Sequence, residues 1–481
     1  MMAHLIEDCL IVIFDELRKD PSSLYSCILV NRFWCRMAMP ILWKNPLEFK
    51  SIFNKENHKF YNLMISLLPR TSRQLLFDDD IELSLPTISK QPLFNYINFL
   101  SIISPKFIDG MIAMLKNERR EFNESQLEPE IYKLFINNCK NAKEFYWKTL
   151  QPISQYEGAS SCFSKLRTLR IEFQIVTSTA LFGMAQICQN VEELKIYNCY
   201  GDNSGLTNFI DIQKNLKSLC LTFKDSKNQS KQLSEVIERK ASTLKKLVIK
   251  PFITSLSPKF LPSLINLEYL KLNDESYNAN ICEWKKYLSI ASLPNLQYLK
   301  IKMITSWNYF ELIEKSLGNI LEIKIYRTHN QDPLCTEKLI ETIAKNCPKI
   351  KKLTIDAELE NLNGIKEIFS NCRQLRMINF STNNDENLNC DKLLEILTNS
   401  SSKTLCEFYF IGNWNFTIEG LENFFKSWRN TRKPLLINMY TGEKNYLEDK
   451  YRNVVKKYYD EEVIKETNLL EYEGDVKFFV N

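Results

Sequence analysis

Glycine and histidine are scarce in this sequence. Only 11 of the 481 residues are glycine, and no G-x-x-x-x-G-K or G-x-G-x-x-G loop occurs that could cradle a phosphate group. The three histidines, His4, His58 and His329, are isolated from one another, so they offer little material for a general base or a metal cluster. We therefore expect that the chain is not an enzyme and that it holds no metal ion and no cofactor.

Disulfide spacings and long apolar runs are also missing. None of the 14 cysteines stands in a C-x-x-C pair, which is typical of a reducing compartment, cytoplasmic or nuclear. The apolar run CLIVIF at residues 9–14 is too short to span a membrane and has acidic flanks that a signal peptide lacks. The net charge of +5 is small for this length, so we expect neither a membrane nor a nucleic-acid partner.

What the sequence does contain is a phrase of the form apolar-x-x-apolar-x-apolar, repeated ten times. It is clearest in NLEYLKLND from Asn266 and NLQYLKIKM from Asn295. The first apolar positions of successive phrases lie 23 to 30 residues apart, which is the period of leucine-rich repeats. These first positions are Leu166, Val191, Leu216, Leu244, Leu267, Leu296, Ile320, Ile350, Leu375 and Leu405.

The last two apolar positions of each phrase are two residues apart, so they share one face of a strand. Between phrases the apolar spacing is helical, as in Leu421, Phe424, Phe425 and Trp428. Each repeat therefore predicts a strand plus a helix, and stacked repeats predict an α/β solenoid, a leucine-rich repeat horseshoe with one continuous core. An open α/β sheet is the alternative, but it would leave the repeated phrase unexplained. PLLINMY at 434–440 and a charged amphipathic helix after it predict a C-terminal cap.

Four cysteines precede a phrase or its degenerate first copy by three residues. A cysteine at this position resembles the cysteine-containing class of leucine-rich repeats, in which it is buried and closes the helix. A free cysteine behaves as a small buried hydrophobe, so we expect packing and no chemistry. The four are Cys139, Cys188, Cys347 and Cys372.

The N-terminal residues predict three short helices. Leu10, Ile13, Phe14 and Leu17 follow helical spacing, and Pro21 marks the start of a second helix. Forty residues bury too little surface to form a stable domain alone. The segments DCLIVIFDEL, SLYSCILVNRFWC and ILW resemble an F-box of the type common in large fungal families, with Leu5-Ile6 in place of the usual Leu-Pro opening. The alternative is a helical cap for the solenoid.

The resemblance divides the chain into an F-box at 1–46, a helical linker that packs on the solenoid at 47–135, and leucine-rich repeats with a C-terminal cap at 136–481. It implies a substrate receptor of SCF ubiquitin ligases, in which the F-box binds a Skp-type adaptor, and through it a cullin, while the repeats hold a protein substrate. A repeat scaffold acting outside ubiquitylation is the alternative. The matched positions that divide between F-box core and adaptor contact are Leu10, Ile13, Phe14, Leu17, Leu29, Val30 and Trp34.

Within each phrase the residues two, four and six places after the first apolar position alternate with the buried ones and face the concave side. These thirty positions hold nine Lys or Arg and five Asp or Glu. The basic bias peaks in three consecutive repeats, where we expect an acidic or phosphorylated substrate to bind. An exposed strand face that only contacts solvent is the alternative. The residues are Lys246, Lys250, Tyr269, Lys271, Tyr298, Lys300 and Lys302.

Overall fold

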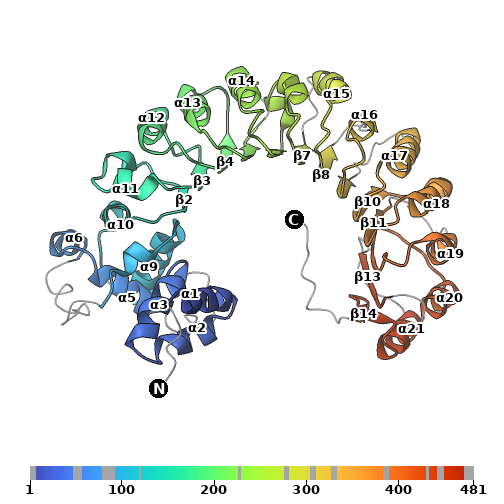
Figure 1. Ribbon diagram of the computed structural model, residues 1–481, viewed down its shortest axis with the longest axis horizontal. Helices are drawn as coiled ribbons and strands as arrows, with labels where there is room; N and C mark the ends of the chain where they lie inside the picture. The colour runs from blue at the N-terminus through green and yellow to red at the C-terminus, as the bar shows by residue number, and fades with distance from the viewer. Residues whose placement is uncertain are drawn as a thin grey trace. The chain divides into compact units, whose positions relative to one another are not determined.

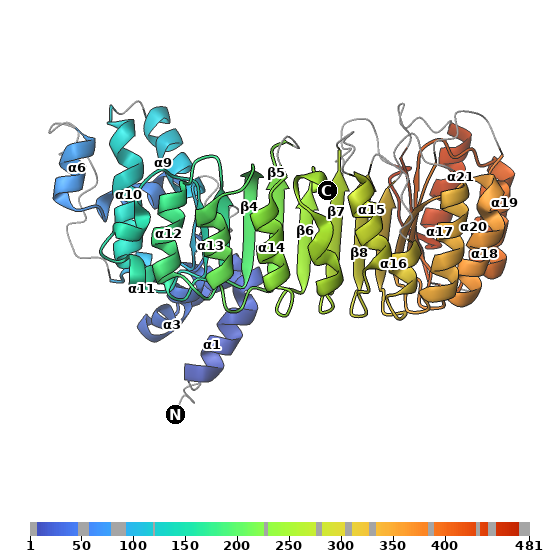
Figure 2. The same ribbon diagram turned by 90° about the horizontal axis from the view of Figure 1, so that it is seen from above.

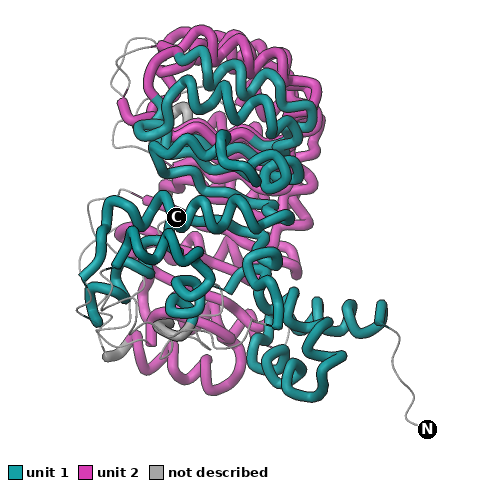
Figure 3. Tube along the Cα trace, turned by 90° about the vertical axis from the view of Figure 1, so that its left-hand side faces the viewer, with its two compact units in different colours: residues 1–199, 203–218 teal, residues 200–202, 219–481 magenta. Residues whose placement is uncertain are grey.

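The computed structural model describes residues 7–46, 57–77, 93–118, 121–225, 229–275, 281–303, 310–326, 333–382, 389–429, 433–440 and 449–470. Within them, fourteen strands follow one another through the sheet in chain order, β1 to β14. The chain divides into two compact units (Figure 3). Unit 1 comprises residues 1–199 and 203–218, and unit 2 comprises residues 200–202 and 219–481.

Unit 1 begins with the three predicted helices, α1 (Glu7–Glu16), α2 (Pro21–Ile28) and α3 (Arg32–Leu42), with a short 3-10 turn η1 (Leu17–Lys19) after α1. Side chains fix the starts of α2 and α3. The Ser23 N–H donates to Asp20 Oδ1 at 3.3 Å, and the Trp34 N–H donates to Asn31 Oδ1 at 2.8 Å. These caps satisfy N–H groups that have no partner within the helix.

In the described residues that follow, five helices and a short strand come before the repeats. They are α5 (Asn57–Ser66), α6 (Arg70–Leu76), α8 (Tyr96–Phe99), β1 (Ile102–Ile103), α9 (Lys106–Asn117) and α10 (Glu124–Asn138). The sheet thus starts inside the segment that we predicted as a linker, because β1 pairs with the first repeat strand, β2 (Glu144–Trp147). Leu5-Ile6, which stand in place of the usual Leu-Pro opening of the resemblance, lie outside the described residues.

The remaining elements of unit 1 alternate as the phrase predicts. The pairs β2–β3 and β3–β4 are parallel, with Phe145 opposite Leu169 and Leu169 opposite Leu194. Gln213 is fully buried after the last helix and links two repeats, because its Oε1 accepts from the Val191 N–H at 2.9 Å and its Nε2 donates to the Cys188 carbonyl at 2.9 Å. These elements are η3 (Ile153–Gln155), α11 (Ala159–Phe163), β3 (Thr168–Glu172), α12 (Ser178–Ile187), β4 (Glu193–Cys199) and α13 (Ser204–Ile212).

Unit 2 continues the alternation from β5, whose first residue belongs to unit 1. In unit 2 taken by itself, helices lie on one side of the strands, and α17 to α20 run next to one another (Figure 1, Figure 2). The strands are β5 (Ser218–Phe223), β6 (Lys246–Lys250), β7 (Tyr269–Asp274), β8 (Tyr298–Met303), β9 (Glu322–Tyr326), β10 (Lys352–Asp356), β11 (Met377–Ser381), β12 (Glu407–Ile411), β13 (Leu435–Tyr440) and β14 (Ile464–Glu466). The α-helices are α14 (Lys231–Arg239), α15 (Ile281–Ile290), α16 (Phe310–Glu314), α17 (Pro333–Asn346), α18 (Leu362–Asn371), α19 (Asp391–Ser400), α20 (Ile418–Trp428) and α21 (Asp449–Asp460).

One repeat departs from the prediction of a strand plus an α-helix. Between β6 and β7 the chain forms two 3-10 segments, η4 (Ile253–Ser255) and η5 (Pro258–Ser263). Pro258 opens η5 and Pro262 lies inside it. Prolines this close together remove N–H donors that a continuous α-helix needs. This explains why two 3-10 segments stand here in place of an α-helix. A further short 3-10 turn, η6 (Leu359–Asn361), precedes α18.

The repeated phrase forms the core, as predicted. All thirty of its apolar positions are exposed by 3% or less, and so are those of the degenerate first copy, Ala142, Phe145 and Trp147. Cys139, Cys188, Cys347 and Cys372 are buried as well. Burial raises the pKa of the Cys188 and Cys372 thiols to about 12, which disfavours the reactive thiolate. The predicted α/β solenoid of leucine-rich repeats is confirmed.

Polar side chains immediately before the phrase tie neighbouring repeats of unit 2 together. The side-chain amides of Asn266, Asn295 and Asn319 each donate to a backbone carbonyl one repeat earlier, at 3.1, 3.1 and 3.0 Å. The accepting carbonyls belong to Ser242, Ile265 and Pro294, which all stand two residues before a phrase. These bonds satisfy carbonyls in the turns that lead into the strands.

The described part of the C-terminal end of unit 2 consists of a strand, an amphipathic helix and a last short strand. Most of the apolar segment 434–440 forms β13, and α21 buries Val455 and Tyr458, with the Tyr458 ring 5.2 Å from the Phe425 ring of α20, while Lys456 and Lys457 are exposed. No described helix is long and apolar enough to cross a bilayer.

Candidate interaction surfaces

Helices α1 to α3 and the turn between α2 and α3 expose large apolar side chains. Leu29 is 69% exposed, Val12 64% and Val30 58%. We call the seven such residues of this region the N-terminal apolar set: Ile11, Val12, Ile13, Tyr25, Leu29, Val30 and Phe33. Isolated exposed apolar residues are ordinary on protein surfaces, but a concentration of them marks an interaction site.

The seven residues that we predicted for the F-box split between core and surface. Leu10 and Phe14 are buried, and the Phe14 ring packs edge-on against Trp34 with centroids 5.3 Å apart. Leu10 and Phe14 therefore hold the helices together and have no surface to offer a partner. Leu17 and Trp34 are half-buried, whereas Ile13, Leu29 and Val30 are exposed. The adaptor-binding role of this set stays a prediction.

The residues that we predicted on the inner face of the sheet lie in register in unit 2. Tyr269 is opposite Tyr298 on the next strand. Lys271 is opposite Lys300, which in turn is opposite Lys324 on β9. Side chains in register on adjacent strands lie about 5 Å apart on the same face. We call this region the lysine–tyrosine face: Lys246, Lys250, Tyr269, Lys271, Tyr298, Lys300, Lys302, Glu322, Lys324 and Tyr326.

Tyrosine rings lie between the lysine ammonium groups of this face. The Tyr269 ring centroid is 4.9 Å from Lys246 Nζ and 5.6 Å from Lys300 Nζ, and it is 6.0 Å from the Tyr298 centroid. An ammonium group over an aromatic face is attracted by the negative electrostatic potential of the ring. The Tyr269 ring therefore helps to hold these two lysines in place.

Glu322 is the acidic residue of the face that our sequence prediction missed. Its Oε1 lies 3.1 Å from Lys300 Nζ and 3.4 Å from Lys324 Nζ, and its side chain is 12% exposed. Burial alone would raise the Glu322 pKa, but hydrogen bonds and charges of the two lysines outweigh it and lower the pKa. The sequence held the signal, because Glu322 stands two residues after Ile320, at a predicted inner-face position.

Lys271 has a different environment from Lys300. Burial, and then the positive charges of Lys250 and Lys300, lower its pKa. Burial alone would lower the pKa of Lys300, but its hydrogen bond to Glu322 and its interactions with Tyr269 and with the Glu322 charge outweigh burial and raise the pKa. In the described part of the chain, neither Lys250 nor Lys271 forms an ion pair. Lys302 is exposed and lies 3.8 Å from the Glu275 carboxylate.

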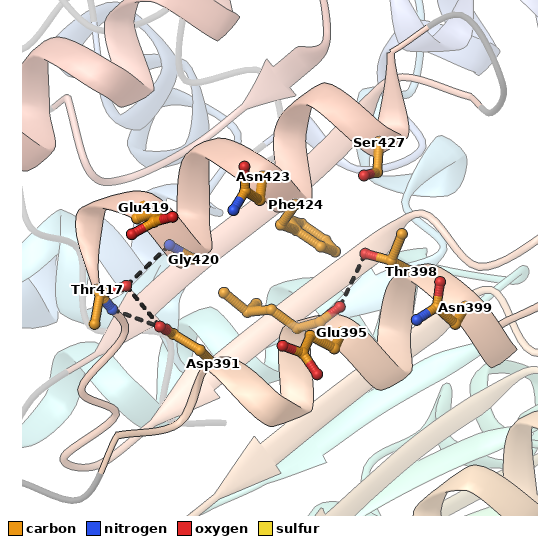
Figure 4. Close-up of a pocket in the computed structure, with 11 residues that line it drawn as sticks. Asp391, Glu395, Thr398, Asn399, Thr417, Glu419, Gly420, Asn423, Phe424 and Ser427 are labelled. Atoms are coloured by element: carbon orange, nitrogen blue, oxygen red, sulfur yellow. Dashed lines mark hydrogen bonds between the residues drawn. The ribbon is translucent and has the colours of Figure 1, made fainter.

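A polar groove of about 300 Å³ lies between α19 and α20, on the helical side of unit 2 (Figure 4). The Asp391 carboxylate in this groove accepts hydrogen bonds from the Thr417 N–H at 2.8 Å and from the Thr417 hydroxyl at 2.6 Å (Figure 4). Thr417 is the N-cap of α20, and its hydroxyl accepts from the Gly420 N–H, so Asp391 fixes the cap residue in place. Glu395 and Glu419 also line the groove, but no histidine or cysteine does. Among the described residues, no group of three His, Cys, Asp or Glu side chains could hold a metal ion.

The fold therefore defines an α/β solenoid of the leucine-rich-repeat type with a helical N-terminal region. No family model matches the sequence, and no curated protein matches it. Among solved structures, the chain is similar to the Rad7 and Elc1 complex from yeast, with 15% identity and a TM-score of 0.42, over 87% of this chain and 95% of that chain. It is also similar to the leucine-rich repeat-containing protein LegL7 from Legionella pneumophila, with 13% identity and a TM-score of 0.31, over 68% of this chain and 94% of that chain.

Proposed function

We propose that this protein is the substrate-recognition subunit of an SCF-type cullin ubiquitin ligase. Its F-box docks a Skp-type adaptor and through it a cullin, and its repeats bind a protein substrate. The observation that carries the proposal is the F-box-like sequence of residues 7–43, which folds as three helices and leaves the N-terminal apolar set exposed. Such a complex works in the cytoplasm or the nucleus.

The chain itself makes and breaks no bond in this proposal. It holds substrate lysines near a ubiquitin-charged conjugating enzyme, so that two encounters become one intramolecular event. The scarcity of histidine and glycine supports a role without catalysis, cofactor or metal ion.

The lysine–tyrosine face is the substrate surface of the proposal. Its lysines favour an acidic or phosphorylated protein segment, and its tyrosines supply rigid contact area. Acidic residues interrupt the basic character along the inner face, at Glu193 in unit 1 and at Glu322 and Glu407 in unit 2. This interruption disfavours nucleic acid, whose backbone needs a continuous basic track.

The test is co-purification of adaptor and cullin with the full chain after changing exposed residues only. We expect the double variant Ile13→Asp with Val30→Asp to lose both partners, since each buried apolar contact contributes about 1.5–3 kcal/mol, or roughly 10- to 100-fold in affinity. Leu150→Asp is the matched control, because Leu150 is 73% exposed and lies outside α1 to α3.

Retained adaptor in the double variant would contradict the proposal. A wild-type chain that captures no Skp-type adaptor would leave the other interpretation of α1 to α3, a helical cap on a repeat scaffold that acts outside ubiquitylation.

A further inference from the structure

The lysines of the lysine–tyrosine face are not equivalent. Glu322 neutralises part of the charge of Lys300 and Lys324, and Glu275 lies near Lys302. What remains without a carboxylate in the described residues is Lys250 and Lys271, together with Lys246, which lies over the Tyr269 ring. The uncompensated positive charge is therefore concentrated on β6 and β7, at Lys246, Lys250 and Lys271. We call these three lysines the centre of the face, and Lys302 is not part of it.

We propose that this centre binds a phosphoryl group carried by a side chain of the protein substrate, with Lys271 as its main ligand and Lys250 and Lys300 beside it. The inference rests on the proposed function, and it names the chemical class of the substrate that the repeats recognise. It narrows the predicted stripe of seven residues to one focal site.

The position of Lys271 explains why an anion is needed there. Its side chain is half-buried between Val248, which is 7% exposed, and Lys300 on the neighbouring strands. A half-buried ammonium group surrounded by like charges is unfavourable unless an anion joins it. A phosphoryl group has three strong acceptor oxygens and a charge of about −1.5 to −2, so it can accept hydrogen bonds from several lysines at once.

A carboxylate fits this centre less well than a phosphoryl group. The face already contains one carboxylate, and Glu322 satisfies only the lysines of β8 and β9. A side chain with a single negative charge would leave most of the remaining charge uncompensated. A run of Asp or Glu would need a longer basic surface, and Glu322 lies beside the centre where such a run would continue.

Glu322 competes with the phosphoryl group for Lys300. Removal of its charge would free Lys300 and Lys324 for the ligand and strengthen anion binding. This expectation is specific to the proposed site, because a loss of fold or of contact area would weaken binding instead.

The experiment uses the purified full chain and beads that carry degenerate peptide pools with a central phosphoserine, serine or aspartate. We expect at least tenfold more protein on the phosphoserine pool than on the other two. Lys271→Gln should reduce this retention about tenfold, and Glu322→Gln should increase it severalfold. Lys245→Gln is the matched control, because Lys245 is exposed, precedes β6 and pairs with Glu268 at 2.7 Å; we expect no change.

Equal retention on the phosphoserine and serine pools would overturn the inference, as would equal effects of Lys271→Gln and Lys245→Gln. Tighter binding of a labelled single-stranded RNA than of the phosphoserine pool would also overturn it. Adaptor co-purification separates the two proposals. Adaptor binding without phosphoserine selectivity contradicts the inference alone, and phosphoserine selectivity without adaptor binding contradicts the proposed function alone.

Discussion

Helices α1 to α3 expose many of their large apolar side chains, whereas the repeats of unit 2 bury theirs. Residues 7–46 hold seven of the eighteen large apolar side chains that are exposed in the described part of the chain, whereas every apolar phrase position in unit 2 is exposed by 3% or less. A repeat covers its apolar face with the next repeat. Three short helices leave part of theirs exposed, and the proposed docking of an adaptor would cover it.

The largest effect should come from a charge placed inside a repeat. Leu270 is fully buried in β7, and Leu270→Asp puts an unpaired carboxylate into the core at a cost of several kcal/mol. We expect unit 2 to unfold at a much lower temperature, as measured by circular dichroism. Lys271→Asp is the control one position along, on the other face of the strand, and it should remain folded. Equal losses would contradict the strand register.

The next effect tests whether a buried residue of α1 contributes to stability while an exposed residue of the same helix does not. Phe14 is fully buried in α1 and Ile13 is 43% exposed. Phe14→Ala should destabilise α1 to α3 by about 3–5 kcal/mol, whereas Ile13→Ala should change stability by less than about 0.5 kcal/mol. Hydrogen exchange of the α1 to α3 amides measures this difference. Similar protection in both variants would remove the distinction between core and contact residues.

A smaller effect should come from a buried polar link between repeats in unit 1. Gln213→Leu keeps the size of the side chain but leaves the Val191 N–H and the Cys188 carbonyl without the bonds that Gln213 supplies, at a cost of roughly 1–3 kcal/mol. Urea unfolding measures the loss. Gln186→Leu, at an exposed position of α12, is the matched control and should be nearly neutral. A neutral Gln213→Leu would show that apolar stacking alone holds these repeats.

The smallest effect should be a gain in stability. Lys271 has a lowered pKa in the folded chain, so its charged form is less favourable there than in the unfolded chain. Lys271→Met should therefore raise the melting temperature by about 1–2 °C, as measured by calorimetry. The gain is complete below the lowered pKa and disappears as the pH rises to the ordinary lysine pKa. Lys245→Met should bring no such gain, and a loss in Lys271→Met would contradict the uncompensated charge.

Much of the fold could be predicted from the sequence, because the phrase specifies the core directly. The short 3-10 segments between β6 and β7 were missed, although Pro258 and Pro262 carried the signal. The lysines of the inner face followed from alternation along each strand. Their pairing did not, because the contact of Glu322 with Lys300 and Lys324 depends on side-chain positions across three strands. The split between Leu10 and Ile13 required the packing of α1 on α3.

The asparagine bonds between repeats have a consequence for how such a chain can change over evolution. Asn266, Asn295 and Asn319 each contact the same position of the preceding repeat, so these three junctions between repeats are built in the same way. A gene rearrangement that duplicates or deletes one whole repeat therefore recreates a junction that already fits. The number of repeats and the side chains along their inner face can then change while the packing of the core stays the same.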